Sequence, residues 1–197
     1  MTNKIITTYA SEIEKYSRFE PRFFYNQSLL KKVFDKFGYE EVKNFATLKS
    51  GSTPEHYESK KNEEDWFFVK AADVKRYNLN LSTVSFVSSE VHKSRIELKV
   101  VPNDILLSSA GTIGFACLVP QIPKEISINQ NVMRIRLKDG NLTKFNPHFL
   151  VAFLNSQFGQ IETKMLLTNN WYLNMKNCPT WRNRYCKKRR RGRERKL

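Results

Sequence analysis

Hydrophobic and polar positions follow two periods along this chain, and each period predicts a different kind of element. Apolar residues recur every three or four positions over 3–17, over Ser28–Phe37 and over 146–166, which predicts three helices. The stretch "RFEPRFFY" interrupts the pattern between the first two, and Gly38 is typical of a helix stop. In the third helix we expect Asn146 at the N-cap and Pro147 in the first turn. Its apolar face should be Phe149, Leu150, Phe153 and Leu154.

Shorter apolar runs predict strands. Trp66–Val69 reads as a buried strand, and 84–101 as a short strand followed by a helical turn. Two more strands should flank the bend "AGT". Residues 126–137 should form another strand, in which Arg134 and Arg136 share one face because side chains alternate along a strand. These elements predict an α/β (α+β) domain, a small twisted mixed β-sheet with flanking helices.

The stretch "SSAGTIG" has three candidate interpretations. A phosphate-binding loop needs a Lys-Ser/Thr pair at its end and opens a helix, and neither holds here. A nucleophile elbow needs Gly-x-Ser-x-Gly, which is absent. The pattern favours a hairpin turn, in which Gly111 supplies a positive φ and Gly114 permits close backbone approach. We therefore find no catalytic residue in the sequence.

Composition and charge narrow the class of protein. The 197 residues are 40 % hydrophobic and 13 % aromatic, a folding composition. Since the sequence has neither a membrane-length apolar run nor a signal-peptide core, we expect a cytoplasmic protein. From Lys176 onward there are eleven basic residues and one acid, so this tail carries +10 of the total +15. The three cysteines suit neither a metal site nor a disulfide framework, and Cys117 should be a buried hydrophobe.

Several polar segments carry side chains suited to DNA. Lys and Arg contact phosphates, whereas Ser, Thr, Asn, Tyr and Arg also bond base edges. The candidate DNA-binding residues are Ser52, Thr53, His56, Tyr57, Lys60, Lys61, Lys70, Lys75, Arg76, Tyr77, Asn78, Lys93, Arg95, Ser109 and Thr112.

The ordered motifs "LKSGSTP", "WFFVKAADV", "VPNDILLSSAGTIGFACLV", "SINQNVMRIRL" and "FNPHFLVAFLNS" carry a family resemblance. Between about Tyr39 and Leu167 the chain resembles the target recognition domain of type I restriction–modification specificity subunits. The resemblance implies an α/β unit that reads one half of a bipartite DNA target, mainly in the major groove, without chemistry of its own. It also implies two prokaryotic partner subunits. The methyltransferase subunit would use S-adenosylmethionine, and the restriction subunit would use ATP with magnesium. This chain itself would need no cofactor and no metal.

This resemblance predicts three regions. Residues 1–38 should form a helical segment packing on the domain, 39–170 the DNA target recognition domain, and 171–197 an atypical basic tail. The family continues into long helices and a second recognition domain, and this sequence does not. The tail is either a phosphate-binding arm or a frameshift product, since a shifted frame from Asn177 permits Leu-Pro-x-Leu-Glu-x-Gln, close to the family's segment.

The sequence therefore predicts a sequence-specific DNA-binding subunit or half-subunit, not an enzyme. Two alternatives stay open. A recognition fragment of a fused restriction–methylation enzyme would carry methyltransferase motifs upstream, and none precedes the domain here. A non-specific basic nucleic-acid-binding protein would depend on the tail. A homodimer of half-length subunits is a further option for the assembly.

Overall fold

The computed structural model describes residues 21–55, 57, 65–94, 98–122, 124–138 and 145–165. The chain divides into two compact units, residues 1–41 with 182–197, and residues 42–181. The helix predicted over 3–17 and the basic tail lie outside the described residues. In the described part, no helix combines the length and the apolar character needed to cross a membrane.

The first unit contains helix α2, Pro21–Phe37, which is longer than the predicted helix from Ser28. We expected Pro21 to break the pattern, but proline fits the first turn of a helix, where its missing N–H would have no partner. Gly38 ends the helix as predicted, with a φ of 76° and its N–H bonded to Phe34 O at 2.8 Å. The packing of this segment on the domain stays a prediction.

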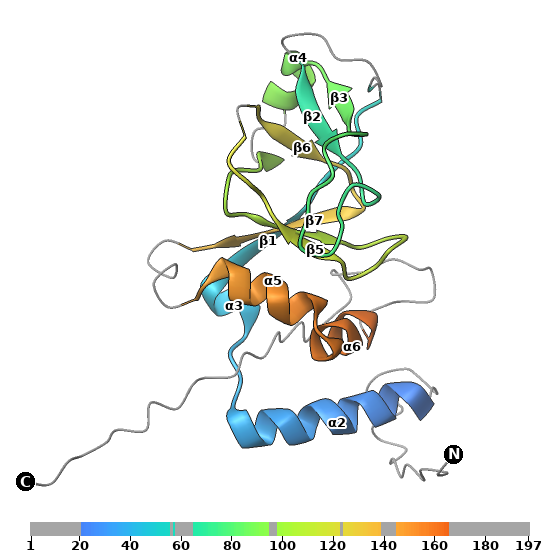
Figure 1. The fold of residues 1–197 in the computed structure, drawn as a ribbon, viewed down its shortest axis with the longest axis vertical. Coiled ribbons are helices and arrows are strands. Elements are labelled where there is room, and N and C mark those ends of the chain that lie inside the picture. The colour runs from blue at the N-terminus through green and yellow to red at the C-terminus, as the bar shows by residue number, and fades with distance from the viewer. Residues whose placement is uncertain are drawn as a thin grey trace, which may run out of the picture. The chain divides into compact units, whose positions relative to one another are not determined.

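The second unit is built on two sheets, which Figure 1 shows one above the other. The four-stranded sheet has the order β1-β7-β4-β5, and all its pairs are antiparallel. The three-stranded sheet has the order β3-β2-β6, in which β2 pairs β3 antiparallel and β6 parallel. The strands are β1 Ala46–Ser50, β2 Trp66–Val69, β3 Ser85–Val87, β4 Ile105–Ser108, β5 Ala116–Leu118, β6 Ile126–Ile128 and β7 Val132–Leu137. The predicted α+β class is confirmed, with two sheets in place of the single expected one.

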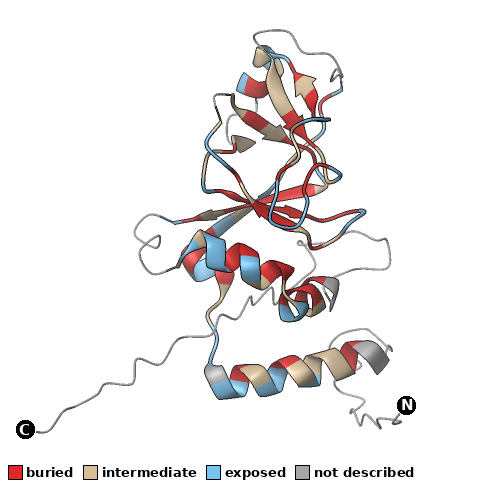
Figure 2. Cartoon of the chain, viewed as in Figure 1, coloured by how far each residue is buried: buried red, intermediate tan, exposed pale blue. Residues whose placement is uncertain are grey.

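An apolar core contributed by both sheets lies in this unit. One cluster of this core includes Val69, Leu106, Cys117, Ile128 and Val132, each of which is at most 2 % exposed. Figure 2 shows buried residues along strands of both sheets. Cys117 is buried as predicted, and burial raises the pKa of its thiol to about 12.

The prediction of one strand over 126–137 is wrong, because a turn at 129–131 divides it into β6 and β7. Val132 N–H bonds to Asn129 O at 3.0 Å, and the Asn129 side chain accepts from Asn131 N–H at 3.1 Å. The two halves therefore pair in different sheets. The predicted common face of Arg134 and Arg136 is confirmed, since both guanidinium groups donate to the carbonyl of Lys99.

The predicted C-terminal helix is also divided, into α5 Pro147–Asn155 and α6 Gln157–Met165. Ser156 has an extended ψ of 165°, and its hydroxyl donates to Phe153 O at 2.6 Å and accepts from Gly159 N–H at 3.2 Å. Asn146 caps α5 as predicted. Leu150 and Leu154 are buried, whereas Phe149 is 57 % exposed rather than part of the buried face.

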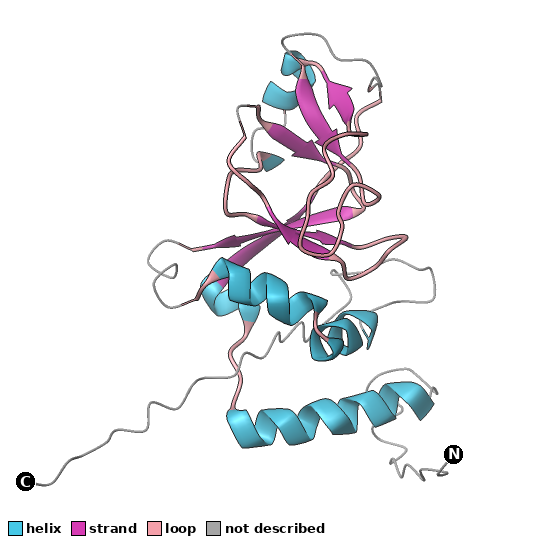
Figure 3. Ribbon diagram, in the orientation of Figure 1, coloured by secondary structure: helices cyan, strands magenta, loops and turns pink. Residues whose placement is uncertain are grey.

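The remaining helices are short: α3, Val42–Phe45, which we did not predict, and α4, Ser89–Lys93, which matches the predicted helical turn. Figure 3 shows α5 and α6 beside the four-stranded sheet, where α5 packs on β5.

Candidate nucleic-acid interface

Four segments meet at one end of both sheets, and we call this end the loop end. It consists of residues 51–54, 70–84, 109–115 and 129–131. In the four-stranded sheet, Ser50 lies opposite Met133 and Ser108 opposite Val132, so the loops there leave from the same edge. The parallel strands β2 and β6 also end on this side, which is the right side of the view in Figure 1.

Gly51 carries the chain from one sheet to the other. Its N–H bonds to Val132 O at 3.0 Å, and the N–H of Ser52 bonds to Ile128 O at 3.1 Å. A Cβ on Gly51 would lie 2.1 Å from Ile128 O, so only glycine fits. Ser52 and Thr53 are therefore held beside the turn at 129–131, where the Thr53 hydroxyl donates to the Gln130 side chain.

Gln130 is an exposed residue at the tip of this turn that sequence reasoning missed. Its amide combines a hydrogen-bond donor and an acceptor, the chemistry that reads base edges. The residue lay inside the single strand that we predicted over 126–137, where nothing distinguished it. The Asn-Gln-Asn sequence is typical of a turn, and a turn predicted there would have identified Gln130 as a surface residue.

Residues 75–78 form a tight turn that projects four exposed side chains. Lys75 N–H bonds to Asn78 O at 2.9 Å, and the flanking Val74 and Leu79 are bridged and buried. Tyr77 has a φ of 66°, which is rare for a residue with a Cβ, and it is 61 % exposed. The structure thus brings the predicted Lys75, Arg76, Tyr77 and Asn78 together.

This turn is fastened to β5. Tyr77 N–H bonds to Ala116 O at 2.9 Å, and the guanidinium carbon of Arg76 lies 4.9 Å from the centre of the Phe115 ring. At the base of the turn, the Asp73 carboxylate accepts from Lys70 N–H at 2.8 Å. Burial raises the pKa of Asp73, while that hydrogen bond and the nearby lysines act against the shift.

The hairpin interpretation of "SSAGTIG" is confirmed, since the stretch joins antiparallel β4 and β5. Gly111 and Gly114 have φ values of 68° and 85°. A Cβ on Gly114 would lie 2.8 Å from Thr163 Oγ1, and the Gln160 side chain of α6 donates to Gly114 O at 2.6 Å. Gly114 therefore permits the close approach we predicted, with side chains of α6.

The two hydroxyl residues predicted in this hairpin differ in exposure. Thr112 is exposed. Ser109 is only 6 % exposed, because its segment packs against the turn at 129–131, where its N–H bonds to Asn131 O at 2.9 Å. We therefore place Thr112 on the candidate surface and withdraw Ser109 from it.

The other predicted residues lie in three places. Lys70 belongs to the loop end, and Tyr57 lies beside it: Lys70 Nζ donates to Ser85 Oγ at 2.8 Å and lies 5.4 Å from the centre of the Tyr57 ring. Lys93 ends α4, which follows β3, so it lies at the opposite end of the three-stranded sheet. The residues His56, Lys60, Lys61 and Arg95 lie outside the described residues.

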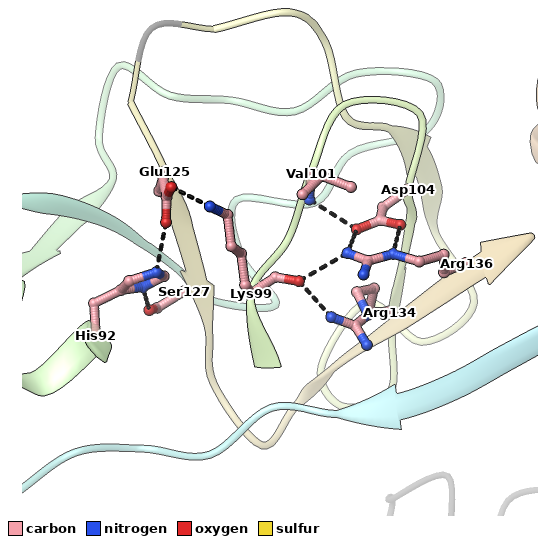
Figure 4. A network of polar contacts seen from close by, with 8 residues as sticks. All are labelled: His92, Lys99, Val101, Asp104, Glu125, Ser127, Arg134 and Arg136. Atoms are coloured by element: carbon pink, nitrogen blue, oxygen red, sulfur yellow. Dashed lines mark hydrogen bonds and ion pairs between the residues drawn. The ribbon is translucent and has the colours of Figure 1, made fainter. Parts of the chain in front are cut away.

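The opposite end of the sheets holds a network of charged and hydrogen-bonding side chains (Figure 4). Arg136 donates to both carboxylate oxygens of the buried Asp104, at 2.7 Å each. Glu125 accepts from Lys99 and from His92, the latter at 2.9 Å. The Asp104 hydrogen bond raises the pKa of Arg136, and burial lowers the pKa of Arg134.

His92 is a buried member of that network. Its side chain is 1 % exposed, its Nδ1 lies 2.6 Å from Ser127 Oγ, and its ring stacks on Trp66 with centroids 4.2 Å apart. Burial lowers the pKa of His92, while the carboxylate of Glu125 opposes the shift. The network fixes the far end of the sheets, since each of these charged groups has a partner within the protein.

Lys75 and Arg76 at the loop end differ from that network. In the part of the chain that the structure describes, no carboxylate lies within ion-pair distance of either residue. Nor do the described residues contain a group of three His, Cys, Asp or Glu side chains placed to hold a metal ion. The arrangement provides cations and hydrogen-bonding side chains on rigid turns, which suits an anionic, hydrogen-bonding polymer.

The α+β fold defined by these elements is also found in solved structures. No family model and no curated protein matches the sequence. One similar structure is a chain from work on the complex assembly and conformational transition of the type I R-M system, at 15 % identity and a TM-score of 0.50, covering 80 % of this chain and 38 % of that chain. Another is the HsdS subunit from Thermoanaerobacter tengcongensis, at 13 % identity and a TM-score of 0.48, covering 81 % and 40 %.

The resemblance to type I specificity subunits that we inferred from sequence motifs is thus confirmed at the level of the fold. This chain spans less than half the length of either solved chain.

Proposed function

We propose that this protein is the DNA target recognition domain of a type I restriction–modification specificity subunit, and that it reads one half of a bipartite target through the loop end. The observation that carries the proposal is the gathering of exposed cations and hydrogen-bonding side chains at that end, on a fold shared with a type I R-M chain. Sequence readout needs this combination, because cations bind phosphates and amides, hydroxyls and guanidinium groups bond base edges.

The rigidity of the loop end supports the proposal. Its turns are tied to the sheets by main-chain hydrogen bonds at Gly51, Ser109 and Tyr77, each between 2.9 and 3.0 Å. A preorganised surface loses less conformational entropy on binding, which favours affinity and specificity. We assign no catalytic role to this chain.

In this proposal the chemistry belongs to other subunits. A methyltransferase subunit would use S-adenosylmethionine, and a restriction subunit would use ATP with magnesium. The solved chains of similar fold are more than twice as long, which is consistent with this domain supplying half of a specificity subunit. A second recognition domain, from another chain or a second copy, would then read the other half-site.

Selection of binding sites from a random duplex library tests the proposal. The full chain at physiological salt should enrich a motif of a few base pairs, and the double variant Lys75→Ala, Arg76→Ala should weaken or change that motif. Lys93→Ala, at the opposite end, is the matched control and should keep it. Loss of the motif in the control alone, or enrichment of no motif by the wild type, would refute the proposal.

A second candidate function is non-specific nucleic-acid binding through the basic tail, because the residues from Lys176 onward carry +10 of the +15 net charge. Substitution of the Lys and Arg residues at 187–191 by Gln in the full chain distinguishes the two. Our proposal predicts lower affinity with an unchanged motif. Loss of all binding, with no motif in the wild type, would favour the tail.

A further inference from the structure

We propose that Arg76 reads a guanine in the DNA target and that Phe115 is the positioning residue that holds its guanidinium for this purpose. The inference rests on the proposed function and deepens it, because it assigns one base and one side-chain geometry to the loop end. It is carried by the stacking of these two side chains, by the backbone of the turn at 75–78 and by the unused donors of Arg76.

A cation–π contact with the Phe115 ring restrains the guanidinium group of Arg76. The Arg76 Cζ atom lies 4.9 Å from the centre of the Phe115 ring. Guanidinium groups stack on aromatic faces, which favours one orientation of the planar fork. Phe115 is itself fixed, since its carbonyl accepts from Ser108 N–H at 2.9 Å and its N–H donates to Ser108 Oγ at 3.0 Å.

The main chain on both sides of Arg76 is equally constrained. Tyr77 adopts its left-handed φ of 66° while its N–H bonds to Ala116 O, the residue that follows Phe115. Non-glycine residues in this region cost energy that the surrounding contacts must offset, and such residues concentrate at functional sites. Arg76 and its stacking partner are therefore attached to the same short strand, β5.

The guanidinium N–H groups of Arg76 are available as hydrogen-bond donors. Arg76 is exposed, and within the described residues its one recorded contact is the Phe115 ring. Arg136 provides the contrast, because Asp104 fills its fork with two hydrogen bonds at 2.7 Å. A stacked, unpaired fork at the tip of a projecting turn fits the O6 and N7 acceptors of guanine, the commonest specific arginine contact in the major groove.

The first experiment compares the wild type with Arg76→Lys in the binding-site selection, using the full chain. Lysine keeps the charge and loses the fork. We expect the wild-type motif to contain a guanine, and Arg76→Lys to lose roughly 5- to 150-fold of the discrimination at that position, the range of one bidentate pair. The slope of log affinity against log salt should stay the same, because the number of cations is unchanged.

Variants of Phe115 test its positioning role. Phe115→Leu removes the ring face and should weaken the same guanine preference, with the other positions of the motif unchanged. Phe115→Tyr restores the face and should restore the preference. A purely structural role predicts instead that Phe115→Leu lowers the melting temperature and affinity for all sequences alike, and this result would overturn the assignment of Phe115.

Lys75→Ala is the matched control for charge, since Lys75 lies beside Arg76 in the same turn. It should reduce the salt slope by about one and leave the motif unchanged, as a phosphate contact does. If Arg76→Ala behaves in the same way, or if the motif contains no guanine affected by Arg76→Lys, then Arg76 is a phosphate contact and the inference fails. The proposed function would survive that result, whereas a wild type without any motif would refute the function itself.

Discussion

Asn155 allows the strongest test of how the loop end is supported. This residue ends α5 and is 5 % exposed, and its side chain covers the outer edge of β5. Its Oδ1 accepts from Ala116 N–H at 3.2 Å, and its Nδ2 donates to Ala116 O at 2.7 Å and to Val151 O at 2.9 Å. The amide therefore takes the place of a neighbouring strand. Asn155→Ala removes all three bonds.

The magnitude follows from these contacts. A net hydrogen bond contributes about 1 kcal/mol, and a buried N–H left without a partner costs about 1–3 kcal/mol. Ala116 is fully buried, and its carbonyl keeps the bond from Tyr77 N–H, so its own N–H is the orphaned group. We expect Asn155→Ala to lower the free energy of unfolding by about 3 kcal/mol, a large effect for one residue.

Urea unfolding at pH 7 measures this loss. Asn78→Ala is the matched control, because Asn78 is exposed, and its stability should change by less than about 0.5 kcal/mol. A second variant, Asn155→Asp, places a carboxylate against the two carbonyls that Nδ2 now bonds. Its folded-state pKa should be raised, so its deficit should shrink as the pH falls and the acid becomes a donor. A loss below about 1 kcal/mol in Asn155→Ala would refute the strand-edge role.

Three further predictions concern stability and reactivity. Gly51→Ala should lower the free energy of unfolding by about 3 kcal/mol, since its Cβ would meet two backbone oxygens at 2.1 and 2.4 Å. Gly111→Ala should cost less, because a Cβ there meets nothing within 4 Å. Equal losses of stability in urea unfolding would contradict this prediction. Burial lowers the pKa of His92, with Glu125 opposing and Lys99 adding to the shift, so the unfolded chain takes up the proton first as the pH falls below about 6.5. Wild type should therefore lose more stability than His92→Gln between pH 7 and 5, and parallel profiles would refute it. Cys117, with a pKa raised to about 12, should resist alkylation at pH 8 until the protein unfolds, as peptide mass spectrometry would show.

Local patterns predicted those parts of the fold that local chemistry decides. The buried strand at Trp66–Val69, the hairpin across Gly111 and the N-cap at Asn146 each follow from a few adjacent residues, and each is confirmed. The same holds for the stop at Gly38, which needs a positive φ.

The breaks inside long apolar patterns were not predictable in this way. Ser156 divides α5 from α6 because its hydroxyl caps both helices, and the helical period continues across it unchanged. Asn129 reverses the chain between β6 and β7 through its buried side chain, although the residues on both sides alternate as one strand would. In both cases a local bond between a side chain and the main chain makes the break, and the hydrophobic period does not reveal it. The candidate site shares this limit: Gln130 was missed with the turn that exposes it.

The residues that support the loop end and those that form its surface are different residues, and this separation bears on how such a domain can change its target. Asn155 and Gln160 hold β5 and its hairpin from the side of α5 and α6, through buried bonds of 2.6 to 3.2 Å. The side chains of Thr112, on that hairpin, and of Lys75, on the turn bonded to β5, are exposed. Exposed substitutions away from special backbone positions change stability by about 0.5 kcal/mol or less. A domain built in this way can therefore exchange its recognition side chains at little cost to folding, provided that the buried bonds beneath them are kept.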